Sequence, residues 1–124
     1  MENNPDLGAL MKKAKLKSRH RIEDKYGNII IGEGRQKILE LIEETGSINQ
    51  TAKAMKMSYR GVWGKIKATE EHLNRQIVIT ERRHGSRLTE YGKRLLIDYT
   101  RLKEECKTAD DTIFRKIFLD EQEV

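Results

Sequence analysis

The stretch that decides the fold is residues 47–67, which read SINQTAKAMKMSYRGVWGKIK. Its first part predicts a short helix from Ile48 to about Met55, and Ser47 can cap that helix by accepting a hydrogen bond from a backbone N–H group. A second helix is expected from Ser58 to about Leu73. The part of this helix inside the stretch holds two glycines, although glycine in a helix interior costs about 1 kcal/mol relative to alanine. These glycines therefore need a reason other than helix stability.

The spacing of residues across the turn between these helices is typical of a helix-turn-helix. Two helices that cross steeply need a small residue at the crossing point, and Ala52 stands there. Apolar residues follow five, ten and fourteen positions later, at Met57, Val62 and Ile66. The turn position four residues after Ala52 usually holds glycine because glycine accepts positive φ. Lys56 in its place should cost at most about 1–2 kcal/mol.

The flanking segments extend this unit to a winged helix-turn-helix. Residues 34–45 predict a preceding helix that Gly46 ends. Residues 76–81 predict a strand, residues 82–87 a turn in the position of a wing, and Leu88 the start of a short return strand. Upstream, the alternating pattern over 16–22, the turn residues at 24–28 and the isoleucines at 29–31 predict a β-hairpin.

A long apolar stripe begins at Leu88, next to Thr89, which is expected to cap the last helix. Its members step by three or four residues: Leu88, Tyr91, Leu95, Tyr99, Leu102, Cys106, Ala109, Ile113 and Ile117. A helix of this length would measure about 45 Å, more than one small domain can cover. We expect a homodimer interface formed by Tyr91, Leu95, Tyr99, Leu102, Cys106, Ile113 and Ile117. The alternative is a break at 108–111, with Asp110 capping a separate helix that folds back.

The charge of the chain is uneven along its length. The net charge is +5, but residues 104–124 hold seven acids and three bases, so the rest of the chain carries +9. One basic cluster runs from Lys12 to Arg21 and a second from Lys53 to Arg87. A basic body with an acidic end favours a polyanionic partner, although a solvated surface selected for solubility would give the same count.

Several functional classes are excluded by composition. No apolar run approaches the ~20 residues that a membrane span needs, and the polar start MENNPDLG is unlike a signal segment. Cys106 is the single cysteine, so we expect a cytoplasmic setting and no structural zinc. No paired carboxylates, Cys/His arrangement or phosphate-binding loop stands in a recognisable frame. We expect no enzyme, no catalytic or metal-binding residues and no cofactor.

The glycine-spaced helix is interpreted as a DNA-reading helix. With Val62 and Ile66 inward, its outer face is basic and small, so it can lie close to a groove wall, while arginine can pair with guanine. Trp63 is expected to pack at the domain edge. Three arginines in the wing suit phosphates. The predicted contacts to double-stranded DNA are Ser47, Gln50, Thr51, Ser58, Tyr59, Arg60, Gly61, Gly64, Lys65, Lys67, Arg82, Arg83 and Arg87.

Longer motifs in this region resemble a known family. G-E-G-R at 32–35, E-T-G-S-I at 44–48, A-K-A-M-K-M-S-Y-R at 52–60, Trp63 and L-T-E-Y-G at 88–92 resemble the N-terminal DNA-binding domain of the ModE family of molybdate-responsive regulators and its LysR-like winged-helix relatives. The resemblance covers about residues 16–105. It implies a homodimeric transcription regulator, with the dimer made by the N-terminal hairpin and the C-terminal helix.

The resemblance and the residues together predict the organisation of the chain. We expect a mainly α fold with a small amount of β: a flexible basic segment at 1–15, a winged helix-turn-helix with its hairpin at 16–88, and a long helical dimerisation segment at 89–124. The expected function is sequence-specific regulation of transcription, with molybdate- or tungstate-related genes as one implied target set. The chain is expected to lack the family's oxyanion-binding domain, and no effector is predicted. The alternative is a winged-helix module that binds another protein.

Overall fold

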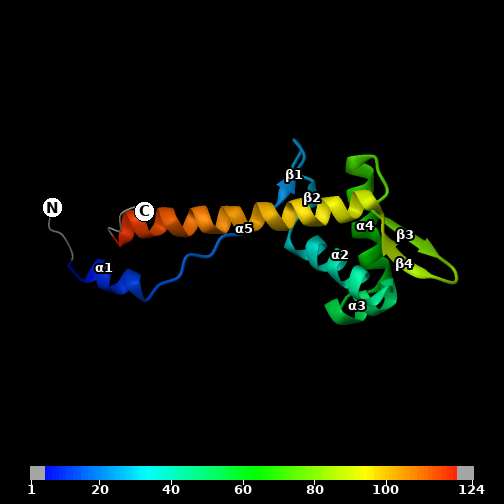
Figure 1. Ribbon diagram of the computed structural model, residues 1–124, viewed down its shortest axis with the longest axis horizontal. Helices are drawn as coiled ribbons and strands as arrows, with labels where there is room; N and C mark the ends of the chain where they lie inside the picture. The colour runs from blue at the N-terminus through cyan, green and yellow to red at the C-terminus, as the bar shows by residue number, and fades with distance from the viewer. Residues whose placement is uncertain (1–4, 120–124) are drawn as a thin grey trace. The chain divides into compact units, whose positions relative to one another are not determined.

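The computed structural model describes residues 5–119 and has the expected order of helices and hairpins (Figure 1). The elements are α1 (Pro5–Lys12), β1 (Ile22–Glu23), β2 (Ile29–Ile31), α2 (Glu33–Thr45), α3 (Ile48–Met55), α4 (Tyr59–Leu73), β3 (Val78–Glu81), β4 (Gly85–Leu88) and α5 (Glu90–Phe118). The mainly α winged helix-turn-helix with small hairpins is therefore confirmed. Residues 5–12 are helical where a loose end was expected, since Leu7, Leu10 and Met11 stand at helical spacing.

The chain divides into two compact units, and the division falls inside α5. Residues 20–101 form the first unit, and the described parts of 1–19 and 102–124 form the second. The expected boundary between residues 88 and 89 does not coincide with this division. The reason is that Leu96 and Tyr99, early in α5, are buried in the core of the first unit.

The helix-turn-helix is built around the predicted apolar positions. Ala52, Val62 and Ile66 are almost fully buried, and Met57 packs against the same core. Lys56 closes α3 in the left-handed conformation, at φ 56°, as the turn position requires. The next backbone N–H, that of Met57, donates to the carbonyl of Ala52 over 2.9 Å. This bond makes the turn tight enough for α4 to cross α3 closely.

The wing is the antiparallel pair β3–β4, with Val78 opposite Leu88 and Glu81 opposite Gly85. Its second strand is joined to the turn between α2 and α3, because the N–H of Ser86 donates to the carbonyl of Gly46 over 2.9 Å. A Cβ atom on Gly85 would lie 2.5 Å from that same carbonyl oxygen, and Gly85 also has φ +73°. Glycine is thus required here for both contact and conformation.

The N-terminal hairpin is shorter than the sequence pattern predicts. Ile22 pairs with Ile31 and Glu23 with Ile29, while residues 16–21 form no strand. Pairing stops because Gly32 caps α2, which begins at Glu33, and so no backbone remains opposite the earlier residues. The turn itself is fixed by Asp24, whose carboxylate accepts from the backbone N–H groups of Tyr26 and Asn28. The bond from the Asn28 N–H is the largest cause that lowers the pKa of Asp24, and the bond from the Asn28 side-chain amide is the next.

The last helix is continuous through residues 108–111, so the expected alternative of a break at Asp110 is wrong. Its start is capped as predicted, since the hydroxyl of Thr89 accepts from the N–H of Gly92 over 2.9 Å. Tyr99, expected in a dimer interface, is instead 1% exposed, and its hydroxyl donates to the carbonyl of His20. Burial first, and then the charge of Glu33, raise the pKa of Tyr99. The stripe therefore belongs to the core at this point.

Candidate nucleic-acid interface

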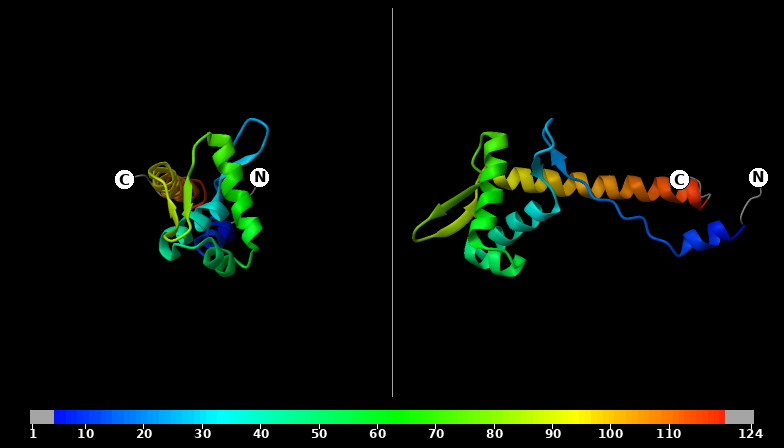
Figure 2. Two further views of the ribbon diagram at one scale, coloured as in Figure 1. Left: turned by 90° about the vertical axis from the view of Figure 1, so that its right-hand side faces the viewer. Right: turned by 180° about the vertical axis from the view of Figure 1, so that it is seen from behind.

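The start of α4 is exposed, and its N-cap residue, Ser58, forms the capping hydrogen bond. The hydroxyl of Ser58 accepts from the N–H of Gly61 over 2.9 Å, so its bonding capacity is partly used by the fold. Tyr59 and Arg60 follow in the first turn, and both side chains are exposed. The left view of Figure 2 shows α4 and the wing side by side, facing the viewer. Tyr59 and Arg60 thus stand where a groove-reading side chain would be needed.

The two glycines of α4 differ in what surrounds them. A Cβ on Gly61 would lie 3.1 Å from the hydroxyl oxygen of Ser58 and 3.4 Å from the end of Met57. Gly61 is therefore explained by packing inside the helix-turn-helix. A Cβ on Gly64 would meet no atom within 4 Å, and Gly64 is exposed. Nothing in the fold itself explains glycine at position 64.

The middle of α4 holds a cation that is already engaged. The ammonium of Lys67 lies 3.0 Å from a carboxylate oxygen of Glu70 and 4.3 Å from the centre of the Trp63 ring. Trp63 is half-buried against the core, as expected for a residue at the domain edge. Lys67 is about half exposed, but its charge is directed at these neighbours. It is less available to a ligand than the sequence suggested.

Glu70 links α4 to the wing. Its side chain is buried, and one carboxylate oxygen accepts from the N–H groups of Ile77 and Val78 at 2.8 and 3.2 Å. The other oxygen receives Lys67. Burying a carboxylate is unfavourable unless hydrogen-bond donors compensate for the lost water, and these three donors compensate for the burial of Glu70. The position at which β3 begins is consequently fixed relative to α4.

The tip of the wing carries two exposed arginines, Arg82 and Arg83. Within residues 5–119 neither of them forms an ion pair. Arg87, predicted alongside them, is ion-paired across the hairpin with Glu81. The hydroxyls of Thr80 and Ser86 also pair across the strands at 3.0 Å. The cationic part of the wing is therefore its tip.

The start of α3 supplies fewer contacts than predicted. Ser47 caps the helix by accepting from the N–H of Gln50 over 3.0 Å, and the Gln50 side chain is exposed. Thr51 is fully buried, and its hydroxyl donates to the carbonyl of Ser47 over 2.8 Å. The prediction that Thr51 contacts DNA is wrong, because its side chain completes the helix-turn-helix core. Sequence alone does not separate a threonine that donates internally from one at the surface.

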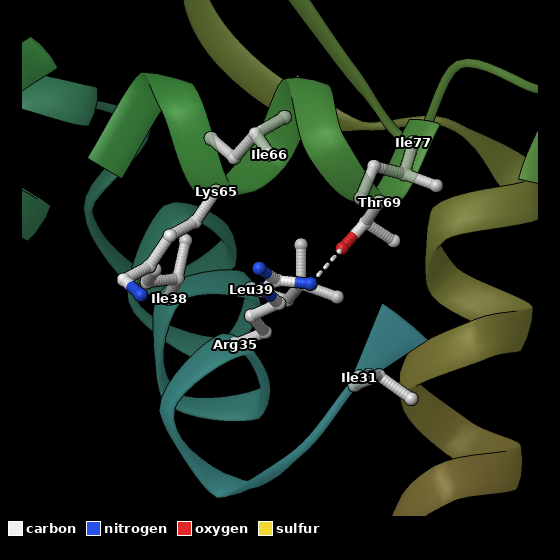
Figure 3. Close-up of a pocket in the computed structure, with 8 residues that line it drawn as sticks. All are labelled: Ile31, Arg35, Ile38, Leu39, Lys65, Ile66, Thr69 and Ile77. Carbon is white, nitrogen blue, oxygen red and sulfur yellow. Dashed lines mark hydrogen bonds between the residues drawn. The ribbon is translucent and has the colours of Figure 1, made fainter. Parts of the chain in front are cut away.

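Lys65 lies on the flank of α4 that faces α2. It lines a small pocket with Ile31, Arg35, Ile38, Leu39, Ile66, Thr69 and Ile77 (Figure 3). The Arg35 guanidinium donates to the hydroxyl of Thr69 at 3.3 Å and to the carbonyl of Ile29. Burial lowers the pKa of Arg35. Arg35 therefore joins the N-terminal hairpin to α2 and α4, a role that its position in G-E-G-R does not reveal.

The residues predicted for a dimer interface fall into two groups. Leu95 packs against the core, as Tyr99 does. Tyr91, Leu102, Ile113 and Ile117 are exposed along α5, and Cys106 is half-buried. Ile97 is 62% exposed on the same helix, and the stripe count did not include it. The available signal was the run Leu95-Leu96-Ile97, because three consecutive residues of a helix cannot all face one core.

Two exposed lysines at the helix-turn-helix turn were not among the predicted contacts. Lys53 stands in the last turn of α3 and Lys56 at its C-terminal cap, only two residues before Ser58. Both are bases close in sequence to the start of α4. Their place in the turn between α3 and α4 was the signal in the sequence that indicates them as contacts.

A tight turn, a capped helix with an open outer face and a basic hairpin fixed beside it define a winged helix-turn-helix, the class of domain that bacterial transcription regulators use to bind DNA. Residues 35–93 match the family described as "Bacterial regulatory helix-turn-helix protein, lysR family". These residues are thus similar to the LysR-type helix-turn-helix domain, and the resemblance to the ModE family is confirmed by the relatives below.

Two curated relatives and one solved structure illustrate the match. The chain is 30% identical over 91 residues to "Molybdenum transport protein ModE" of Azotobacter vinelandii, covering 70% of this chain and 34% of the relative. It is 36% identical over 61 residues to "Uncharacterized HTH-type transcriptional regulator YvbU" of Bacillus subtilis (strain 168), covering 49% of this chain and 21% of the relative. The crystal structure of the CbnR_DBD–DNA complex has a TM-score of 0.54 at 23% identity, covering 64% of this chain and 90% of the chain in that structure. The chain spans about a third or less of the length of the curated relatives it matches.

Proposed function

We propose that this chain binds double-stranded DNA as a homodimer and regulates transcription. The observation that carries the proposal is the outer face of α4, where exposed Arg60 and open Gly64 lie on the helix that Glu70 fixes beside the basic wing. An exposed glycine without a packing role lowers helix stability, and close approach to a ligand explains why it is there. Regulation of this kind takes place on the chromosome, so the proposal includes a cytoplasmic location.

The proposal assigns different tasks to the helix and the wing. Ser58, Tyr59 and Arg60 enter the major groove, where arginine forms a bidentate pair with guanine. Arg82 and Arg83 contact phosphates or a narrow minor groove from the wing tip. The caps at Ser47 and Ser58 present backbone N–H groups at helix starts, which favour phosphate oxygens. The ion pairs of Lys67 and Arg87 place these two residues at the edge of the contact.

The central experiment is selection of bound fragments from a random duplex pool, followed by affinity measurements on the selected site. A two-fold symmetric consensus is expected, with half-sites about 34 Å apart or a multiple of that. Arg60→Ala should cost about 1–3 kcal/mol on the selected site and relax base preference. Arg83→Ala should weaken binding to all sequences more evenly. If Arg60→Ala leaves affinity and preference intact, α4 is not the reading helix, and binding to a protein partner becomes the better explanation.

The homodimer is proposed from the exposed apolar side chains of α5. Leu102, Ile113 and Ile117 are 41%, 53% and 67% exposed, a series that a second copy would cover. Leu102→Glu is expected to give a monomer with weak binding to the symmetric site, because each half-site alone is a weak target. Thr108→Glu, with the same charge change at a polar position of α5, should stay dimeric. A wild type that sediments as a monomer at tens of micromolar contradicts this part.

Control of molybdate- or tungstate-related genes is the narrowest form of the proposal. It is supported by the Azotobacter vinelandii relative, whose name concerns molybdenum transport. Mapping of the bound promoters in the host cell tests it directly. Enrichment at genes that handle these oxyanions is expected, and binding sites confined to unrelated genes would remove this part while leaving DNA binding in place.

A further inference from the structure

Residues 13–21, K-A-K-L-K-S-R-H-R, form a basic segment that the α4–wing site does not use. A base stands at every odd position: Lys13, Lys15, Lys17, Arg19 and Arg21. All five are exposed, and residues 14–21 form neither helix nor strand. Figure 1 shows this part of the chain as an extended connection between α1 and β1. The alternation is therefore not explained by a paired strand.

Lys13 lies in the turn that closes α1, where its N–H donates to the carbonyl of Leu10 over 3.1 Å. Beyond that turn the connection is extended, and alternate side chains of an extended backbone point to the same side, which gathers Lys15, Lys17 and Arg19 along one edge. Of the intervening side chains, Ala14, Leu16 and Ser18 are exposed, and His20 is half-buried. The carbonyl of His20 accepts from the Tyr99 hydroxyl, which ties this end to the core of the first unit. The segment is thus anchored at one end and basic along one edge.

Most of the charge on this edge is uncompensated. Arg21 is ion-paired with Glu23. Among residues 5–119, Lys13, Lys15, Lys17 and Arg19 have no ion-pair partner. These four cations span six residue steps, which is at most about 20 Å at the rise of an extended chain. Such a row of like charges repels itself unless an anion of similar spacing lies against it.

The phosphate backbone of DNA has the required spacing. Each strand carries one phosphate per ~3.4 Å of axis, so a 20 Å path passes roughly six of them. Lysine suits phosphate as a point charge, whereas lysine is depleted at protein interfaces. We propose that residues 13–19 bind phosphates of the duplex flanking the stretch that α4 and the wing read. This inference rests on the proposed function and adds a second, sequence-independent contact to it.

The test compares two variants of the full chain with equal net charge. In the first, Lys13, Lys15, Lys17 and Arg19 are all changed to Gln. In the control, Lys25, Lys37, Arg75 and Lys93 are changed to Gln; these are three lysines and one arginine that are exposed and belong to the other compact unit, residues 20–101. Affinities are measured across salt concentrations on the selected site alone and on the same site with about ten base pairs added at each end, roughly one helical turn.

Wild type and control are expected to bind the longer duplex more tightly, whereas the first variant should lose that preference. On the longer duplex, its slope of log K against log salt should fall by about 3–4 for each chain bound, since each phosphate contact contributes about 0.9. Its base preference should not change. Circular dichroism should show an intact fold, because none of the four replaced side chains is buried.

An unchanged slope and length preference in the first variant would overturn the inference while leaving the Arg60 result standing. Equal losses in both variants would also overturn it, because total charge rather than the segment would then be responsible. If wild type binds no duplex, the proposed function fails together with the inference. If the first variant loses binding to phosphatidylserine vesicles while its duplex binding is unchanged, the segment binds a membrane surface instead of DNA.

Discussion

Replacing Gly64 with alanine separates what the fold requires from what DNA binding requires. A methyl group at this position meets no atom within 4 Å, so the substitution has no steric cost in the chain itself. Alanine in a helix interior is favoured over glycine by roughly 0.5–1 kcal/mol. We therefore expect Gly64→Ala to be more stable than wild type, with a midpoint of thermal unfolding raised by about 2–6 °C.

The same methyl group should weaken DNA binding. It would stand on the outer face of α4, between the helix backbone and the groove wall, and would hold the two apart. Interfaces packed as densely as protein interiors do not absorb an extra methyl without moving. A loss of at least ten-fold in affinity, which is about 1.4 kcal/mol, is expected on the selected duplex.

Thermal unfolding and fluorescence anisotropy on one preparation of each variant decide the matter. Gly34→Ala is the matched control, because Gly34 is also exposed in a helix and also has no atom near a built Cβ. It should keep wild-type affinity. A Gly64→Ala variant that is stabilised and still binds with wild-type affinity would refute the close approach of α4 to DNA.

Three further predictions concern the parts of the fold that hold the site. Glu70→Gln replaces a buried carboxylate that accepts from Ile77 and Val78. Urea unfolding should show that the free energy of unfolding falls by about 1–3 kcal/mol. The control Glu71→Gln, at an exposed position, should change it by less than about 0.5 kcal/mol. Gly92→Ala places a Cβ 2.2 Å from the carbonyl oxygen of Ile77, so a loss of at least 1–3 kcal/mol is expected; a wild-type midpoint would contradict this contact. The pKa of Asp24 is held down chiefly by the Asn28 N–H, so its contribution is present above about pH 4 and lost as pH falls. The free energy of unfolding of Asp24→Asn should therefore change less than that of wild type as pH falls below about 4. Curves of stability against pH that run parallel for the two proteins would show that Asp24 does not cause the pH dependence.

The order of the elements in the DNA-binding unit could be predicted from sequence because its signals are local. Ala52, Val62 and Ile66 stand at fixed spacing, and caps such as Ser47 and Thr89 act within one helical turn. The left-handed turn could be assigned even with lysine at position 56, since the tight turn, rather than the residue, imposes positive φ there.

The errors came from contacts between distant parts of the chain. Tyr99 fits an exposed stripe by spacing, but it is buried because its hydroxyl reaches the carbonyl of His20, 79 positions earlier. Thr51 is a local case: its hydroxyl donates to the carbonyl of Ser47, four residues earlier, and its side chain is buried, which the residue type alone does not reveal. Glu70 has no local signature either, because its partners at 77 and 78 become neighbours only when α4 ends and the chain turns back.

The way the wing is attached has a consequence for how such a domain can diversify. Its strands are fixed by the bond from Ser86 to Gly46 and by Glu70, whereas the side chains of Arg82, Arg83 and His84 at its tip are exposed. Substitutions or insertions at 82–84 therefore cost little folding free energy. If the tip contacts phosphates as proposed, its side chains can change the strength of binding while the framework that positions α4 stays the same, so affinity and base preference can vary independently.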